Sequence, residues 1–131
     1  MRMPARYPLA MKARVLLVED EENLRRAAAR MLKSMGYSVF ETANGPEALA
    51  YLRNGGQADL LFSDVVMPGG MNGFDLIGKA RGVRRELKAL VTSGYANVHR
   101  PGTDRPDVPL LLKPYRRVDL AKSIRGTLDQ T

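Results

Sequence analysis

The stretch that decides the fold runs from Leu60 to Gly70 and reads Leu-Leu-Phe-Ser-Asp-Val-Val-Met-Pro-Gly-Gly. Its first residues form a short apolar run that predicts a buried strand, and the proline and glycines that close it predict a loop. Asp64 stands at the junction between the two. A strand that ends on a carboxylate beside such a loop presents that carboxylate to a ligand. Asp64 is therefore the first candidate site residue.

Three other apolar runs also deliver polar groups at their C-terminal ends. These groups are Glu19 and Asp20 after residues 14–18, Thr92 after residues 88–91, and Lys113 after residues 109–112. The runs are nearly continuous in apolar character, as expected of parallel strands buried on both faces of a sheet. If all four runs are parallel strands of one sheet, the acids, the hydroxyl and the lysine meet at one edge.

The chain alternates predicted strands with predicted helices, which favours an α/β parallel sheet covered by helices on both faces. The strands are expected at residues 14–18, 38–42, 60–63, 88–92 and 109–112. The helices are expected at residues 22–35, between Asn44 and Gly55, at residues 73–81 and at residues 118–129. In the first helix, an apolar stripe at helical spacing is predicted to face the core. Its members are Leu24, Ala28, Met31, Leu32 and Met35.

A further helix, the fourth along the chain, should lie between residues 95 and 108, and we expect it to be short or irregular. Pro101, Gly102 and Pro106 interrupt this segment, and an interior proline costs a helix about 3 kcal/mol. At the end of the first helix, Gly36 stands where a left-handed C-terminal cap is needed.

Composition excludes several classes of protein. The 131 residues are the size of one domain, and the absence of cysteine excludes disulfides and thiolate metal sites. The net charge is +7, but the arginines are scattered and no DNA-binding motif is visible, so no DNA partner is expected. No apolar run approaches the roughly 20 residues that cross a bilayer, so no membrane insertion is expected. We interpret residues 1–12 as a disordered leader and expect a cytoplasmic protein.

The order of acid pair, lone aspartate, threonine–serine and lysine–proline resembles the receiver domain of response regulators, the CheY-like domain of two-component signalling. The resemblance covers residues 13–129. It implies a flavodoxin-like, doubly wound fold in which five parallel strands have the order 2-1-3-4-5. It also implies a cis peptide bond between Lys113 and Pro114, which aims the lysine into the pocket.

The acids predict a metal site. Carboxylates of Glu19, Asp20 and Asp64 packed together repel one another, and a divalent cation removes that repulsion. Mg²⁺ prefers oxygen ligands in octahedral geometry and usually keeps several waters. Direct ligation is expected from Asp20 and Asp64, with Glu19 acting through a water. The resemblance adds the backbone carbonyl of Val66 to the ligands.

By resemblance, Asp64 accepts a phosphoryl group from the phosphohistidine of a sensor histidine kinase or a histidine phosphotransfer protein. Mg²⁺, the Lys113 ammonium and the Thr92 hydroxyl are expected to neutralise the phosphoryl oxygens. Such a domain is not an enzyme with a separate substrate; it catalyses its own phosphoryl transfer and autodephosphorylation, with acyl phosphates as possible small-molecule donors. Because no output domain follows the last helix, we expect the phosphorylated form to signal by conformational change to an unknown downstream protein.

Three alternatives stay open. The first is a receiver module of a hybrid histidine kinase or a phosphorelay intermediate, because residues 67–73 and 91–96 resemble those of hybrid-kinase receivers. The second is a haloacid-dehalogenase-like phosphatase, which needs a second aspartate where Val66 stands. The third is a flavodoxin-like flavin-binding domain, whose cofactor phosphate the acids at residues 19–22 would repel.

One position departs from the pattern of the resembling family. Leu110 stands three residues before Lys113, where many receivers carry Tyr or Phe as a rotameric switch. The coupling between Thr92 and an aromatic ring that is known in those relatives is therefore not expected in this chain.

Overall fold

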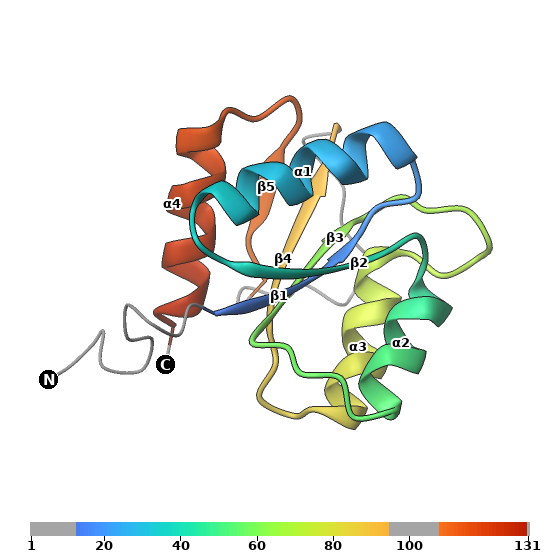
Figure 1. The fold of residues 1–131 in the computed structure, drawn as a ribbon. Helices are drawn as coiled ribbons and strands as arrows, with labels where there is room; N and C mark the ends of the chain where they lie inside the picture. The colour runs from blue at the N-terminus through green and yellow to red at the C-terminus, as the bar shows by residue number, and fades with distance from the viewer. Residues whose placement is uncertain (1–12, 95–107, 131) are drawn as a thin grey trace, which may run out of the picture.

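The computed structural model describes residues 13–94 and 108–130. The leader predicted at residues 1–12 and the irregular helix predicted before the last strand lie outside the described residues. Strands and helices alternate from residue 14 to residue 93, and a further strand and a last helix lie between residues 110 and 128 (Figure 1). The elements are β1 Arg14–Val18, α1 Glu22–Ser34, β2 Ser38–Thr42, α2 Gly45–Arg53, β3 Leu60–Asp64, α3 Gly73–Val83, β4 Lys88–Ser93, β5 Leu110–Leu112 and α4 Arg117–Leu128.

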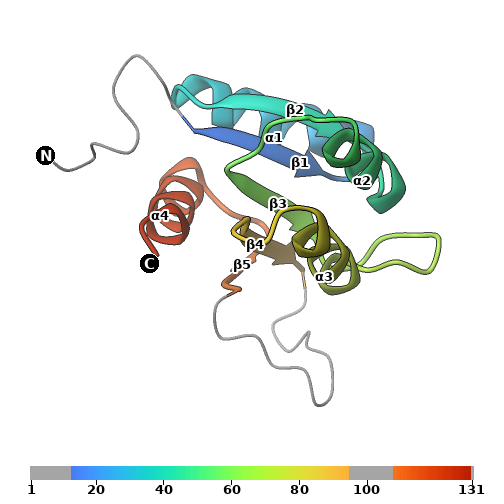
Figure 2. The ribbon, with the colours of Figure 1, turned by 90° about the horizontal axis from the view of Figure 1, so that it is seen from below.

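The five strands form one parallel sheet in the order β2-β1-β3-β4-β5. The predicted strand order is therefore confirmed. Figure 2 shows α2 and α3 next to each other on one side of the sheet and α4 on the other side. Two hydrophobic cores fill the space between these layers, one beneath α2 and α3 and one beneath α1 and α4. Helices on both faces were predicted, and the two cores confirm them.

Strand β3 is the central element, because all five of its residues are buried. Leu61 packs into the core beneath α2 and α3, whereas Leu60 and Phe62 pack into the core beneath α1 and α4. The register places Asp64 beside Thr92 on β4. Because neighbouring parallel strands end at the same level, the polar groups that follow them meet at the carboxyl edge.

Local sequence signals set the helix ends. The Glu21 carboxylate caps α1 by accepting a hydrogen bond from the Leu24 amide at 2.7 Å. Asn72 and Asp75 form a reciprocal capping box at the start of α3. Gly36, which has a φ of 98°, supplies the left-handed conformation after α1. The predicted helix ends agree with the observed ends to within two residues, and the starts at Glu22 and Gly73 coincide.

The predicted inward stripe of α1 is wrong at its first member. Leu24 is 49% exposed, and the buried face of the helix is formed by Ala28, Ala29 and Leu32. The reason is position, since Leu24 in the first turn of α1 lines the pocket that holds the acids and is not part of the core beneath α1 and α4. Met31 and Met35 are partly buried against the core.

Gly73 brings the start of α3 against the end of β3. Its amide donates a hydrogen bond to the Val65 carbonyl at 2.8 Å. A side chain at this position would collide with the backbone carbonyl of Asp64 and would lie 3.1 Å from the Cα of Val65. The absence of a side chain at Gly73 therefore allows the backbone of Asp64 to lie where it does.

We predict that Gly73→Ala destabilises the protein by about 1–3 kcal/mol, because the added methyl group must push the backbone of Asp64 or the helix itself. Gly82→Ala is the matched control on the same helix, since a Cβ there meets no atom within 4 Å. The control is expected to be neutral or up to about 1 kcal/mol more stable. Urea denaturation of both variants measures the difference, and equal stability of the two would contradict the packing described here.

Candidate functional site: an acidic pocket at the carboxyl edge of the sheet

A pocket of about 230 Å³ opens at the carboxyl edge of the sheet. It is lined by residues from the β1–α1 loop, the ends of β3 and β4, and the residue after β5, namely Glu19, Asp20, Glu21, Leu24, Asp64, Val66, Thr92, Ser93, Gly94 and Lys113. The structure brings together all six residues that the sequence singled out as site candidates. Sequence reasoning did not assign Glu21, Leu24 or Ser93 to this pocket.

The carboxylate of Asp64 is the buried centre of the pocket, with only 5% of the residue exposed. The Lys113 ammonium lies 2.7 Å from its Oδ1. Two elements deliver these groups, since Asp64 ends β3 and Lys113 follows β5. The Lys113 amide donates to the Ser93 carbonyl at 2.8 Å, and the Lys113–Pro114 bond is cis, as predicted.

The acid pair after β1 presents its two carboxylates differently. Glu19 is 6% exposed, and its side chain accepts hydrogen bonds from Lys113 at 3.1 Å and from the Glu21 amide at 3.1 Å. Asp20 is exposed to solvent. Glu19 is thus buried and held by fixed donors, whereas Asp20 lines the pocket as a solvent-exposed residue.

The donor set suits a hard divalent cation. Glu19, Asp20 and Asp64 each offer a carboxylate oxygen, and the three oxygens lie within 4.8 Å of one another. All three are oxygen donors of the kind that Mg²⁺ prefers, and the exposed position of Asp20 leaves room for the waters that this ion retains. One ammonium group faces two buried carboxylates, so negative charge exceeds positive charge among these side chains.

That excess charge is visible in the proton affinities. Burial, and then the hydrogen bond and charge of Glu19, raise the pKa of Asp64 to about 7, against the opposing pull of Lys113. Burial also acts to raise the pKa of Glu19, but hydrogen bonds involving Asp64, the Glu21 amide and Lys113 outweigh it, so that pKa is lowered. The contact between the two carboxyl groups therefore acts in opposite directions, raising the pKa of Asp64 and lowering that of Glu19. Burial alone would lower the pKa of Lys113, and its contacts with Asp64 and Glu19 raise it instead.

Thr92 lines the pocket, but its hydroxyl is engaged elsewhere. The Oγ1 atom donates a hydrogen bond to the Leu111 carbonyl on β5 at 2.7 Å. The Thr92 carbonyl accepts from the Val65 amide at 3.0 Å, which ties the end of β4 to the loop after β3. Any ligand that draws the Thr92 hydroxyl into the pocket must break its bond to β5.

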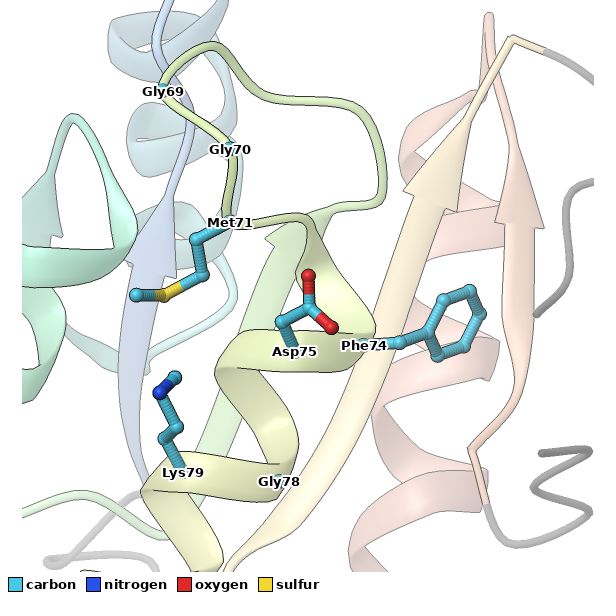
Figure 3. A pocket seen from close by; sticks show the side chains of 7 residues that line it. All are labelled: Gly69, Gly70, Met71, Phe74, Asp75, Gly78 and Lys79. Carbon is cyan, nitrogen blue, oxygen red and sulfur yellow. The ribbon is translucent and has the colours of Figure 1, made fainter.

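A second hollow, of about 460 Å³, lies along the start of α3 (Figure 3). Its lining residues are Gly69, Gly70, Met71, Phe74, Asp75, Gly78 and Lys79. Figure 3 shows the Met71 and Lys79 side chains directed to one side of α3 and Phe74 directed to the other. None of the described residues that line this groove lines the acidic pocket. The groove therefore adds no side chain to that pocket.

Comparisons with known proteins agree with the geometry of the pocket. The model of the family described as response regulator receiver domain matches residues 15–125. The chain is 38% identical over 125 residues to the sensor kinase CckA of Brucella abortus, which is 93% of this chain and 13% of that kinase. It is 35% identical over 117 residues to the response regulator receiver protein CpdR of the same organism, which is 88% of this chain and 96% of CpdR. The chain therefore spans a small part of one relative and nearly all of the other.

Solved structures show the same fold. The receiver domain of the hybrid histidine kinase CckA has a TM-score of 0.74 and 40% identity, over 88% of this chain and 99% of that domain. The response regulator TrrA of Thermotoga maritima, solved in complex with Mg²⁺ and BeF, has a TM-score of 0.75 and 25% identity, over 88% of this chain and 98% of TrrA.

Each described helix is too short or too polar to serve as a membrane span.

The raised pKa of Asp64 predicts a pH-dependent stability in the absence of divalent cations. Between the unfolded pKa of 3.8 and the folded value of about 7, the native state binds more protons than the unfolded state. The contribution of Asp64 to the free energy of unfolding therefore falls as pH rises through this window, and the loss is complete above it. We expect Asp64→Asn to be more stable than the parent at pH 8, by a difference on the order of 2–4 kcal/mol.

Urea denaturation in a chelator at pH 4, 6 and 8 measures this difference. It should be smallest at pH 4, which lies close to the unfolded pKa of 3.8, and largest at pH 8, which lies above the folded value of about 7. Asp129→Asn, on an exposed carboxylate near the C-terminus, is the control and should show no such trend. A parent that equals or exceeds Asp64→Asn in stability at pH 8 would contradict the excess of negative charge in the pocket.

Proposed function

The chain belongs to the response regulator receiver domain family, and from this premise we propose that Asp64 accepts a phosphoryl group from a phosphohistidine donor with Mg²⁺ in the acidic pocket. The observation that carries the proposal is the contact of the buried Asp64 carboxylate with Lys113, at 2.7 Å, beside the carboxylates of Glu19 and Asp20. A nucleophilic carboxylate, a cation and oxygen ligands for a metal are the groups that phosphoryl transfer to aspartate needs.

The transfer step forms one bond and breaks one bond. An Asp64 carboxylate oxygen attacks phosphorus, and the bond from phosphorus to the donor nitrogen breaks, with its electron pair passing to the imidazole. The product is an acyl phosphate on Asp64. Hydrolysis of this acyl phosphate, in which water attacks phosphorus and the carboxylate leaves, returns the domain to its starting state and constitutes autodephosphorylation.

The positively charged Lys113 and the oxygen ligands of the pocket have different proposed roles. The Lys113 ammonium is already 2.7 Å from Asp64 and 3.1 Å from Glu19, so it is placed to pair with a phosphoryl oxygen as a compact point charge. Asp20, Asp64 and the Val66 carbonyl are assigned to the metal directly, with Glu19 acting through a water. When bound, Mg²⁺ supplies a positive charge to a second phosphoryl oxygen.

Thr92 is the proposed conformational switch. An added phosphoryl group carries about −1.5 to −2 charge and attracts the Thr92 hydroxyl. That hydroxyl now bonds the Leu111 carbonyl at 2.7 Å, so its movement exchanges a bond to β5 for a bond to the phosphate. The exchange alters contacts between β4 and β5 and transmits the signal to the surface.

The partners follow from the phosphoryl donor. We assign a sensor histidine kinase or a histidine phosphotransfer protein upstream, in the cytoplasm, and a protein downstream. A receiver module of a hybrid kinase, or a relay intermediate, is the second candidate, favoured by 40% identity to the receiver of the hybrid kinase CckA. The match to 96% of CpdR favours a separate receiver protein.

Intact mass spectrometry tests the acceptor. The parent, incubated with Mg²⁺ and a small acyl-phosphate donor, should gain one phosphoryl group. Asp64→Asn should gain none, because an amide is not a nucleophile of this kind, and a chelator should abolish the gain in the parent. Lys113→Met should be phosphorylated at least about tenfold more slowly, since a phosphoryl oxygen loses its ammonium partner.

Asp129→Asn serves as the matched control, because it removes a carboxylate that is exposed and lies outside the pocket. It should be labelled as fast as the parent. Labelling that persists in Asp64→Asn would place the acceptor elsewhere and defeat the assignment.

Phosphotransfer from purified donors addresses the partner. We expect labelled phosphoryl groups to pass to the parent from the phosphohistidine of a CckA-like kinase or of a phosphotransfer protein, and not to Asp64→Asn. Rates at short reaction times rank the donors. The parent could accept phosphoryl groups from acyl phosphates but from no phosphohistidine protein in a broad panel. That result would contradict the histidine kinase as donor, while Asp64 would remain the acceptor.

A further inference from the structure

Arg25, in the second turn of α1, reaches back across the loop that carries the acid pair. Its Nη1 donates a hydrogen bond to the backbone carbonyl of Glu19 at 3.0 Å. Its Nε lies 3.6 Å from Oε1 of Glu41 on β2. The Arg25 side chain is only 19% exposed, so the guanidinium is held between α1, the β1–α1 loop and the edge strand.

The contact with Glu19 is made to its backbone and not to its carboxylate. From β2, the Thr42 carbonyl accepts the Glu19 amide at 3.1 Å, and the Thr42 hydroxyl donates to the Leu17 carbonyl at 2.9 Å. The backbone of Glu19 is therefore fixed on its amide side by β2 and on its carbonyl side by Arg25. The Glu19 carbonyl belongs to the peptide bond between Glu19 and Asp20. The hydrogen bond from Arg25 therefore orients the peptide that leads into Asp20.

A planar guanidinium can serve two acceptors at fixed angles, which a flexible ammonium cannot do as well. Here the guanidinium donates a hydrogen bond to a loop carbonyl and forms an ion pair with a carboxylate on a strand. The carboxylate of Glu41 orients the guanidinium, and the guanidinium orients the loop. Groups that hold metal ligands in position contribute to metal affinity without touching the metal.

We propose that Arg25 is a positioning residue for the metal site, in which it holds the Glu19–Asp20 backbone so that both carboxylates face Asp64, and that Glu41 acts through Arg25. The inference rests on the proposed function, because it concerns the Mg²⁺ that the pocket would bind. The acids suit that ion by their oxygen donors and their spacing within 4.8 Å.

The neighbouring arginine supplies a matched control. Arg26 is 63% exposed, and its Nη2 pairs with Oε2 of Glu22 at 2.7 Å along the surface of α1. Arg26→Met therefore removes the same charge and a similar side chain from the same helix while leaving the loop contacts intact. Any effect of charge on long-range attraction of Mg²⁺ should be shared by the variants of Arg25 and Arg26.

The test measures Mg²⁺ affinity by calorimetry in the parent, Arg25→Met, Arg25→Lys, Arg26→Met and Glu41→Gln. We expect Arg25→Met to raise the dissociation constant roughly three- to tenfold over that of Arg26→Met. Arg25→Lys, which keeps the positive charge but not the planar guanidinium, should fall between the two. Arg25→Met with Glu41→Gln should bind no more weakly than Arg25→Met alone, because both substitutions break one unit.

Two further readouts separate positioning from general stability. Amide hydrogen exchange in the metal-free protein should quicken across residues 19–22 in Arg25→Met and remain unchanged in β4. The rate of phosphorylation by an acyl phosphate should fall at limiting Mg²⁺ and recover to within about twofold of the parent at saturating Mg²⁺. Loss of stability with Mg²⁺ affinity equal to that of Arg26→Met would overturn the proposal.

The failure of the proposed function gives a different pattern. If the parent and Arg26→Met both bind no Mg²⁺, the proposed function itself is wrong. The same holds if both bind Mg²⁺ and neither accepts a phosphoryl group on Asp64. If Arg25→Met does not fold, Arg25→Lys and Glu41→Gln decide the matter. Parent-like Mg²⁺ affinity in both would overturn the assignment of Arg25.

Discussion

The contact between Lys113 and Asp64 is the interaction on which the site depends. One ammonium group is shared by two buried carboxylates, at 2.7 Å from Asp64 and 3.1 Å from Glu19. A buried carboxylate without a partner is strongly disfavoured, so the lysine allows these acids to be buried at all. Because it is a single charge, it leaves the pocket short of positive charge and suited to a cation that arrives from solution.

The fold brings together four segments that are distant in sequence, one of which carries that ammonium. Parallel pairing aligns the ends of β1, β3, β4 and β5, and the register places Asp64 beside Thr92. Two cores on opposite faces of the sheet hold the strands in that register. Two contacts fix the backbone that carries the acids. Gly73 packs closely against the backbone of Asp64, and Arg25 donates a hydrogen bond to the carbonyl of Glu19.

Sequence patterns were sufficient for the strands and for five pocket residues, because polar groups that follow apolar runs must collect at one edge of a parallel sheet. These five are Glu19, Asp20, Asp64, Thr92 and Lys113, whereas Val66 came from the resemblance. The strand order came from resemblance to receivers, since several orders fit the same alternation. Periodicity wrongly turned Leu24 inward, because it cannot tell which turn of a helix borders a pocket and which turns pack against the core. The bond from Thr92 to Leu111 and the bridge from Arg25 to Glu41 depend on register between strands, which a one-dimensional pattern does not contain.

The measurement that tests the central claim most directly is a crystal structure of the protein with Mg²⁺ and beryllofluoride, a phosphoryl mimic. We predict the mimic bonded to Asp64, the Lys113 ammonium against one of its fluorines, and the metal bound among the oxygens of Asp20, Asp64 and the Val66 carbonyl. A mimic or metal bound away from these residues, with Lys113 still paired to a bare Asp64, would contradict the account.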